Sequence, residues 1–307
     1  MSITLRTCGE DDVETLRSLV VDDSLAAHFD KFQGPGGLEH KLHDRVLARR
    51  GVQLAFVDGE PAGCGVPWMF SDPHDTWVMM RVGVLERFRR RGVGAALACA
   101  LVAFARAEAP DASPAISGSA WLPNPEAAAL ARRLGFVHER WFWLMERPRG
   151  VQAEAAWPDG VTVAAFDGSE TMLRAWVDAY NDSFAHHFRF HAADLEYGRV
   201  LAADPSFRAD GLLLAWRDGA VAGFCRNELH ATRGEIGALG VVQAARGIGL
   251  GRALLRWGVR WLEANQPHRI TLLVDGENEN ALRLYRSERF DVARTREIWS
   301  LPRVASA

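Results

Sequence analysis

Two glycine-bearing stretches decide the fold of this chain: VGVLERFRRRGVG at Val82–Gly94 and LGVVQAARGIGLG at Leu239–Gly251. Both end in the pattern Arg-x-x-Gly-x-Gly, and both lead from an apolar segment into an Ala- and Leu-rich one. Gly83 and Gly240 occupy the same place in the two stretches and lie 157 residues apart (240 minus 83). A strand, a glycine loop and a helix are therefore expected twice in this chain.

Further matches flank the loops in the same order. Residues 51–63 (GVQLAFVDGEPAG) parallel residues 211–223 (GLLLAWRDGAVAG) at an offset of 160. Leu134–Phe136 parallels Glu288–Phe290 at an offset of 154. Ordered matches at nearly one offset indicate a duplicated domain.

The stretch 149–160 is the expected linker, because it contains Pro and Gly around an Ala-rich middle without a core-facing period. We therefore predict an N-terminal domain at 1–148 and a C-terminal domain at 161–307. Alternating strand and helix patterns in the second half indicate an α/β fold with a mixed sheet. The expected strands are 161–166, 212–216, 221–227, 235–242, 269–274 and 290–301. One helix is expected to begin after Ser169, and three further helices are expected at 192–203, 249–265 and 278–286.

The composition is that of a globular chain without a nucleic-acid or membrane partner. The 307 residues carry a net charge of −3, so the basic surface typical of nucleic-acid binding is not expected. No run of about 18 apolar residues occurs, and the N-terminus lacks the apolar core of a signal peptide. The cysteines have no metal or disulfide spacing; they are Cys8, Cys64, Cys99 and Cys225. We expect a cytoplasmic protein and assign no metal ligands.

The second loop has the chemistry of an anion site. The first turn of a helix presents unpaired N–H groups, and its dipole favours negative charge. Glycines allow close approach of a pyrophosphate, and Arg246 adds a planar cationic fork. No Gly-Lys-Ser/Thr follows, and Leu254 stands where a dinucleotide-binding G-x-G-x-x-G would need its last glycine. These departures argue against a P-loop NTPase and against a dinucleotide-binding fold.

The loops resemble the GCN5-related N-acetyltransferase (GNAT) superfamily, which carries Gln/Arg-x-x-Gly-x-Gly/Ala after its fourth strand. Residues Asn278–Phe290 (NENALRLYRSERF) are also similar to the family's N-x-x-A-x-x-x-Y-x-x-x-G-F segment, with Arg289 in place of Gly. The tandem layout with an intact C-terminal copy resembles the mycothiol synthase type. The resemblance implies two tandem GNAT-like domains, each a mixed, mostly antiparallel sheet flanked by helices, and acetyl-CoA as the cofactor.

The resemblance also implies which residues contact acetyl-CoA. In the C-terminal half they are Leu239, Gly240, Val241, Arg246, Gly247, Ile248, Gly249, Leu250, Gly251 and Asn278. In the N-terminal half they are Val82, Gly83, Val84, Arg89, Gly92 and Gly94.

The resemblance places proton-handling groups in the C-terminal half alone. Glu235 occupies the general-base position and Tyr285 the general-acid position, while a backbone N–H of Leu239–Val241 is the expected oxyanion donor. At the repeat offsets, Glu235 corresponds to Val78 and Tyr285 to Ala131, neither of which moves a proton. The N-terminal half is therefore expected either to hold a CoA-like ligand or to act as a structural partner, without catalysis.

The acceptor side is less defined. The polar and aromatic segment Tyr180–His191 is expected beside the acceptor, with Asp182 and His187 as substrate contacts. Mycothiol synthase-like proteins carry a lysine and a tyrosine where this chain has Glu228 and Leu273. The charge reversal and the lost hydroxyl distinguish it from that type, and an acid near the acceptor suits a cationic or polyamine-like amine.

The predicted function is acetyl-CoA-dependent N-acetylation of a small-molecule primary amine by direct transfer, in a monomer or homodimer. One alternative is mycothiol synthesis proper, in which a cysteinyl aminosugar is acetylated. Acetylation of protein termini or lysines would need an open peptide groove. An alternative of another class is a non-catalytic acyl-CoA-binding regulatory module, which would need neither Glu235 nor Tyr285.

Overall fold

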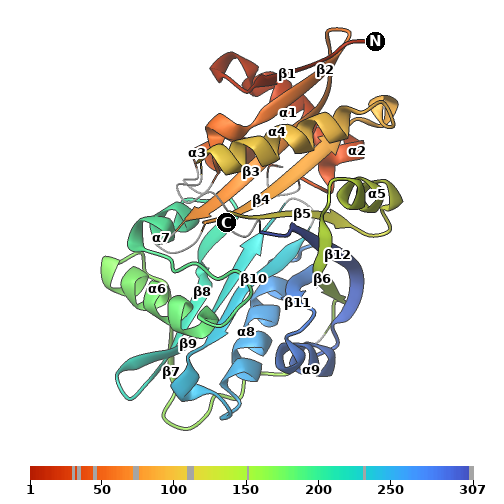
Figure 1. Ribbon diagram of the computed structural model, residues 1–307. Helices are drawn as coiled ribbons and strands as arrows, with labels where there is room; N and C mark the ends of the chain where they lie inside the picture. Colours follow the sequence, from red (N-terminus) through yellow and green to blue (C-terminus); the bar gives the residue numbers. More distant parts are fainter. Residues whose placement is uncertain are drawn as a thin grey trace. The chain divides into compact units, whose positions relative to one another are not determined.

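The computed structural model describes residues 1–29, 32, 36–43, 47–71, 76–108, 114–150, 152–230 and 233–303 (Figure 1). The chain forms two compact units. We call Met1–Trp141 with Arg296–Ala307 the N-terminal unit, and Phe142–Thr295 the C-terminal unit. Each is α/β, with a mixed, mostly antiparallel sheet and flanking helices, so the predicted fold class is confirmed.

The N-terminal unit has the sheet order β1-β2-β3-β4-β5-β12, in which only β4 and β5 are parallel among the described pairings. Its strands are β1 (Ile3–Thr7), β2 (Gln53–Val57), β3 (Glu60–Ser71), β4 (Thr76–Val84), β5 (Ala115–Trp121) and the Arg296–Leu301 part of β12 (Asp291–Leu301). Its helices are α1 (Val13–Val21), α2 (Asp23–Ala26), α3 (Gly37–His43), α4 (Val93–Glu108) and α5 (Pro125–Arg133).

The C-terminal unit repeats this plan with the order β6-β11-β10-β9-β8-β7, in which only β10 and β11 are parallel among the described pairings. Its strands are the Phe142–Arg147 part of β6 (Val137–Arg147), β7 (Thr162–Ala165), β8 (Phe207–Arg217), β9 (Ala220–Leu229), β10 (Gly234–Val241) and β11 (Ile270–Asp275). Its helices are α6 (Glu170–Phe184), α7 (Leu195–Ala202), α8 (Leu250–Ala264) and α9 (Glu279–Ser287).

The last strand of each sheet comes from the other half of the sequence. Residues Phe142–Arg147 of β6 pair with β11, and Arg296–Leu301 of β12 pair with β5. The predicted boundaries at residues 148 and 161 follow the sequence repeat, whereas the units follow packing. Those boundaries therefore stay a prediction.

The elements expected in the second half are present for local reasons that the sequence already carries. The Ser169 side chain accepts a hydrogen bond from the N–H of Met172 and caps α6. The side chain of Asn278 caps α9 in the same way. Among the described residues, no helix is long and apolar enough to cross a membrane.

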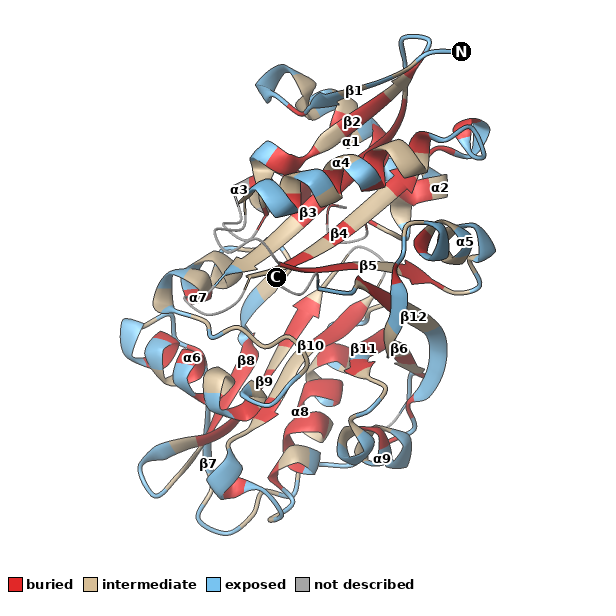
Figure 2. Ribbon diagram, in the orientation of Figure 1, coloured by how far each residue is buried: buried red, intermediate tan, exposed pale blue. Residues whose placement is uncertain are grey.

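The sheet of the C-terminal unit buries both faces. One face packs against α8 and α9, as shown by the cluster of Ile236, Leu254 and Leu272. The other packs against α6 through Trp176 and Phe224. Figure 2 shows that the buried positions follow the strands and the inner side of α8. Strand β10 thus has an α6 face and an α8 face, and its side chains alternate between them.

Candidate functional site

The two glycine loops have the same backbone path. A 3-10 turn follows each strand, at Glu86–Phe88 after β4 and at Gln243–Ala245 after β10. Gly92 and Gly249 then take left-handed φ values of 90° and 89° at equivalent places. Gly247 has φ 83°, and Arg90 takes 62° at the corresponding position. The loop shape is therefore kept even where one glycine has become arginine.

Space is left at the glycines of the second loop. A Cβ added at Gly247 or Gly249 would meet no heavy atom within 4 Å, so these positions are open. Gly249 also lies directly before α8, where N–H groups point outward. The loop therefore fits an anionic group such as a pyrophosphate.

The loop arginines brace the chain. In the C-terminal unit, Arg246 Nε and Nη2 donate to the carbonyls of Val241 and Ser183 at 3.3 and 3.1 Å. In the N-terminal unit, Arg89 Nε and Nη2 donate to the carbonyls of Val84 and Ser24 at 3.2 and 3.1 Å. In both units the guanidinium thus ties the loop to the preceding strand and to a helical segment.

Asp182 adds a second tie in the C-terminal unit. Its Oδ1 accepts the backbone N–H of Gln243 at 2.7 Å, at the start of the turn that carries the glycines. The structure thus places this predicted substrate residue beside the loop. His187 packs its ring 4.4 Å from that of Phe184, and the resulting loss of water lowers its pKa.

Gly240 and Gly83 have a packing role. A Cβ at Gly240 would lie 2.5 Å from the ring of Phe224 and 2.8 Å from the Ser183 hydroxyl. A Cβ at Gly83 would lie 2.7 Å from the ring of Phe29. The missing side chain therefore lets an aromatic ring approach the sheet at the same place in both units.

Strands β10 and β11 separate beside the loop. Their parallel pairing runs from Gly234 to Ile236 on β10, whereas β10 continues to Val241. Leu239, Gly240 and Val241, which the family resemblance predicts to contact acetyl-CoA, therefore lie beyond the paired part. The separation gives the backbone of these residues access that a continuous ladder would deny.

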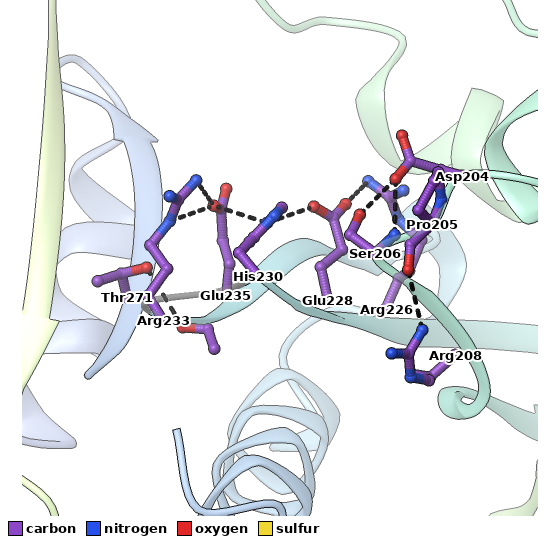
Figure 3. A network of polar contacts seen from close by, with 11 residues as sticks. Asp204, Pro205, Ser206, Arg208, Arg226, Glu228, His230, Arg233, Glu235 and Thr271 are labelled. Atoms are coloured by element: carbon purple, nitrogen blue, oxygen red, sulfur yellow. Dashed lines mark hydrogen bonds and ion pairs between the residues drawn. The ribbon is translucent and has the colours of Figure 1, made fainter. Parts of the chain in front are cut away.

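Glu235 is a buried carboxylate on β10, with 7% of its surface exposed. Its Oε2 accepts from Arg233 Nε and Nη2 at 3.1 and 2.9 Å and lies 3.5 Å from His230 Nε2 (Figure 3). An ionised carboxylate buried without partners would be unfavourable by several kcal/mol. Arg233 and His230 supply the partners that an ionised Glu235 would need, and they fix the orientation of its side chain.

Glu228 continues the chain of charges. Its Oε2 is 3.1 Å from His230 Nε2, and its Oε1 is 2.9 Å from Arg226 Nη2. Burial alone would lower the pKa of His230, but hydrogen bonding to Glu228 and Glu235 outweighs it, so the pKa is raised above 6.5. We call Arg226, Glu228, His230, Arg233 and Glu235 the charged network. It neutralises the charge of Glu228, which weakens the expectation of a cationic acceptor.

The acidic members and His230 also have the proximity of metal ligands. One ligand atom from each of Glu228, His230 and Glu235 lies within 4.8 Å of the others. Arg226 and Arg233 already pair with the two carboxylates, so a cation would have to compete with them. We therefore interpret the group as an ion-pair network and not as a metal site.

A β-bulge makes room for the network. The pairing of β10 with β9 shifts between Ile236 and Ala238, which leaves Gly237 as the extra residue. A Cβ at Gly237 would lie 2.4 Å from Glu228 Oε1 and 3.2 Å from Arg226 Nη2. Only glycine leaves this space to the ion pair.

Because of the bulge, the predicted N-terminal counterpart of Glu235 is wrong by one residue. Glu235 pairs with Glu228, and the residue equivalent to Glu228 at the hairpin offset of 160 is Trp68, which pairs with Met79. The counterpart of Glu235 is therefore Met79 and not Val78, because β10 contains one more residue than β4 between this site and the loop. Neither side chain accepts a proton, so the expected loss of the base in the N-terminal half is unchanged.

Tyr285 has the counterpart that the sequence predicts. The N–H of Phe290 donates to the carbonyl of Tyr285, and the N–H of Phe136 donates to that of Ala131. The Tyr285 side chain, like that of Leu239, packs against the core cluster on the α8 face, and burial together with the nearby Cys225 thiol raises the pKa of the phenol. Glu235 alternates with Ile236 and so lies on the α6 face. The two predicted proton-handling groups thus flank β10 from opposite faces.

Comparison with known proteins decides the family. Residues 15–136 and 171–289 each match the acetyltransferase (GNAT) family model. The chain belongs to the GNAT acetyltransferase family. The two matches cover both halves, which confirms the predicted tandem arrangement.

Several relatives are named mycothiol acetyltransferase, and two of them show the range of the match. That of Frankia alni is 37% identical over 189 residues, which are 57% of this chain and 56% of that protein. That of Kineococcus radiotolerans is 37% identical over 268 residues, 85% of this chain and 81% of that protein. The match therefore spans little more than half of the first relative's length. A solved tandem GNAT protein from the clavulanic acid biosynthesis pathway superposes with a TM-score of 0.70 at 16% identity, covers 100% of both chains and shares the fold.

Sequence inspection identified Glu235 and Glu228 but missed the other members of the charged network. Arg226 and Glu228 alternate along β9, and His230 takes the next alternate position, directly after the strand ends at Leu229. Polar residues at every second position of a buried strand point to one face, and this signal would have found them. In this chain the alternation of polar residues indicates which face of the sheet carries the charged side chains.

Proposed function

We propose that the C-terminal unit transfers an acetyl group from acetyl-CoA to the primary amine of a small molecule. The observation that carries the proposal is that Glu235 and Tyr285 flank β10, the strand that leads into the glycine loop, from opposite faces. Deprotonation of the nucleophile calls for a base and protonation of the leaving group calls for an acid, and a carboxylate and a phenol supply these two functions. The N-terminal unit has Met79 and Ala131 at these places and has neither group.

Each residue has a defined task in this proposal. Glu235 accepts the proton that the ammonium group of the acceptor must lose, directly or through water. A backbone N–H among Leu239–Val241 donates to the oxyanion that develops during attack. Tyr285 donates its phenolic proton to the departing sulfur, and its raised pKa keeps that proton in place at neutral pH.

Acetyl-CoA supplies the activated acetyl thioester. The residues that would hold it are the loop Arg246–Gly251, whose open glycines fit a pyrophosphate, the β10 residues Leu239–Val241, and Asn278. Arg246 donates hydrogen bonds to two backbone carbonyls. It would therefore support cofactor binding by stabilising the loop conformation as well as by its positive charge. The matching loop of the N-terminal unit, with Arg89, Gly92 and Gly94, provides a second cradle without proton-handling groups.

A cysteinyl aminosugar is the second candidate acceptor, favoured by the names of the relatives. Glu228, paired with Arg226, and Leu273, with 38% of its surface exposed, are the features that set this chain apart. A regulatory acyl-CoA-binding module has no use for a buried Glu235. Retention of that carboxylate at a cost in desolvation therefore favours an enzyme.

Release of free CoA against a panel of amines tests the proposal. The panel contains a cysteinyl aminosugar, polyamines and amino sugars, and is repeated with Glu235→Gln and Tyr285→Phe. We expect turnover with at least one amine and its loss in both variants, with acetyl-CoA binding retained. Tight acetyl-CoA binding without release for any amine would favour the module, and full activity of both variants would refute the assigned roles.

A further inference from the structure

The two units differ in chemistry at the charged network. Pairing registers place Val66, Trp68, Phe70, Trp77 and Met79 of the N-terminal unit at the positions of Arg226, Glu228, His230, Arg233 and Glu235. The residues at these N-terminal positions are all apolar or aromatic. The rings of Phe70 and Trp77 stack with their centroids 5.0 Å apart. The same fold therefore forms with apolar residues at these places. The charged network is not required by the architecture, which points to a role in chemistry.

His230 lies at the centre of this network (Figure 3). A single nitrogen, Nε2, is 3.1 Å from Glu228 Oε2 and 3.5 Å from Glu235 Oε2. Carboxylate oxygens only accept hydrogen bonds when ionised, so this nitrogen must carry the proton. One N–H is thus shared between two carboxylates, and His230 separates two like charges.

We propose that His230 is a positioning residue of the acetyl transfer, which uses this shared N–H to hold Glu235 ionised and aligned as the proton acceptor. The inference rests on the proposed function of Glu235. Glu228 acts one step further away, because it fixes the imidazole from the other side. His230 itself does not touch the reacting atoms.

The surrounding groups define what happens without the imidazole. Arg233 faces Glu235, and Arg226 faces Glu228. Figure 3 shows Asp204 and Ser206 beside Arg226, and Thr271 of β11 beside Glu235. With His230 removed, two buried carboxylates face each other with one arginine each. Like-charge repulsion and burial both raise a carboxyl pKa, so Glu235 would accept a proton from solvent at higher pH.

The chain itself suggests the variant. His230→Phe introduces the aromatic residue that the N-terminal unit carries at Phe70, and His230→Gln keeps an N–H donor. In His230→Phe we expect the acidic limb of the pH profile of kcat/KM to move to higher pH by about one unit. At pH values below this limb, kcat/KM should therefore be about tenfold lower than in the parent. His230→Gln should recover most of this loss. The exposed His268, changed to Phe, is the matched control.

A double variant separates positioning from general damage. Adding Glu228→Gln to His230→Phe removes the opposing carboxylate, so the acidic limb should return toward its original position. A lower rate with an unshifted limb in His230→Phe, or no return in the double variant, would overturn the inference. Acetyl-CoA binding and a cooperative thermal transition establish that each variant is folded.

The inference and the proposed function fail in different ways. If Glu235→Gln abolishes turnover while His230→Phe leaves the profile unchanged, the inference is wrong and the assigned base stands. If Glu235→Gln retains turnover, both are wrong. Loss of activity in Glu235→Gln together with a shifted limb in His230→Phe supports both.

Discussion

Glu235 of β10 stands directly opposite Glu228 of β9 in the antiparallel pairing, and both side chains are buried. Like charges in such a pair destabilise a sheet. The pair is accommodated because Arg226 and Arg233 lie on its outer sides and His230 lies between the carboxylates. An added atom in this space would therefore disturb several ion pairs at once.

Gly237→Ala is predicted to have this effect. The new methyl group would lie 2.4 Å from Glu228 Oε1, so the ion pair with Arg226 must move. We expect the free energy of unfolding to fall by about 1–3 kcal/mol and turnover to fall with it. Denaturant unfolding and the rate of CoA release measure the two effects. Gly118→Ala is the strand control, because its Cβ would meet no heavy atom closer than 3.9 Å; equal losses in both variants would contradict the steric explanation.

Tyr285→Phe tests the general acid. Burial raises the pKa of the phenol above its ordinary value of about 10, so the group stays protonated throughout the neutral and mildly alkaline range. Removal of the hydroxyl should lower kcat by about 100-fold or more and leave acetyl-CoA affinity intact. The packing against Phe290 is preserved, since only one oxygen is lost.

Steady-state kinetics from pH 6 to about pH 10 provide the measurement. Because Tyr285 is not expected to ionise in this range, the pH profiles of kcat for the parent and for Tyr285→Phe should have the same shape at alkaline pH. Tyr197→Phe on α7 is the control and should retain turnover. An alkaline limb present in the parent and absent from Tyr285→Phe would show that the phenol ionises more easily than its burial implies.

Arg246→Ala tests the bracing of the loop. The guanidinium donates to two backbone carbonyls, and each such bond contributes about 1 kcal/mol. We expect the KM for acetyl-CoA to rise about tenfold, with a smaller change in kcat. Arg246→Lys should not restore the value, because an ammonium cannot reproduce the planar fork.

The control for Arg246 is Arg217→Ala. Arg217 is an arginine near the β8–β9 turn whose Nε lies 3.8 Å from Asp218. Titration calorimetry with acetyl-CoA separates binding from turnover. An unchanged affinity in Arg246→Ala would mean that the glycines alone determine the loop conformation.

Local patterns carried most of the fold. The offset of the two glycine stretches predicted the duplication, and Ser169 predicted where α6 begins. These features depend on neighbours in sequence, which is why they are legible there. The contributions of β6 and β12 to the sheets of the opposite halves were not predictable, because strand partners are chosen by tertiary packing.

The candidate site could be predicted only in part, because the pairing of its strands also depends on tertiary packing. Glu235 and Tyr285 were predicted from the resemblance to the GNAT superfamily and stay predictions in their catalytic roles. The counterpart of Glu235 shifted from Val78 to Met79 because a single bulged residue, Gly237, changes the register without changing the motif. His230 continues the alternation of Arg226 and Glu228 in the sequence, but its place between the carboxylates of Glu228 and Glu235 depends on the pairing of two strands.

The raised pKa of His230 predicts a pH-dependent stability. A group whose folded pKa lies above its unfolded value stabilises the fold at low pH, and this contribution is lost as pH rises through the folded pKa. For His230 the contribution is complete below about pH 6.5 and declines above it. The difference in unfolding free energy between the parent and His230→Gln should therefore be largest near pH 5.5, where carboxylates are still mostly ionised. Urea unfolding at pH 5.5 and pH 8.5 measures it, with the exposed His268→Gln as control. A difference that grows toward alkaline pH would mean that the imidazole is neutral in the folded protein and does not bridge the two carboxylates as a cation.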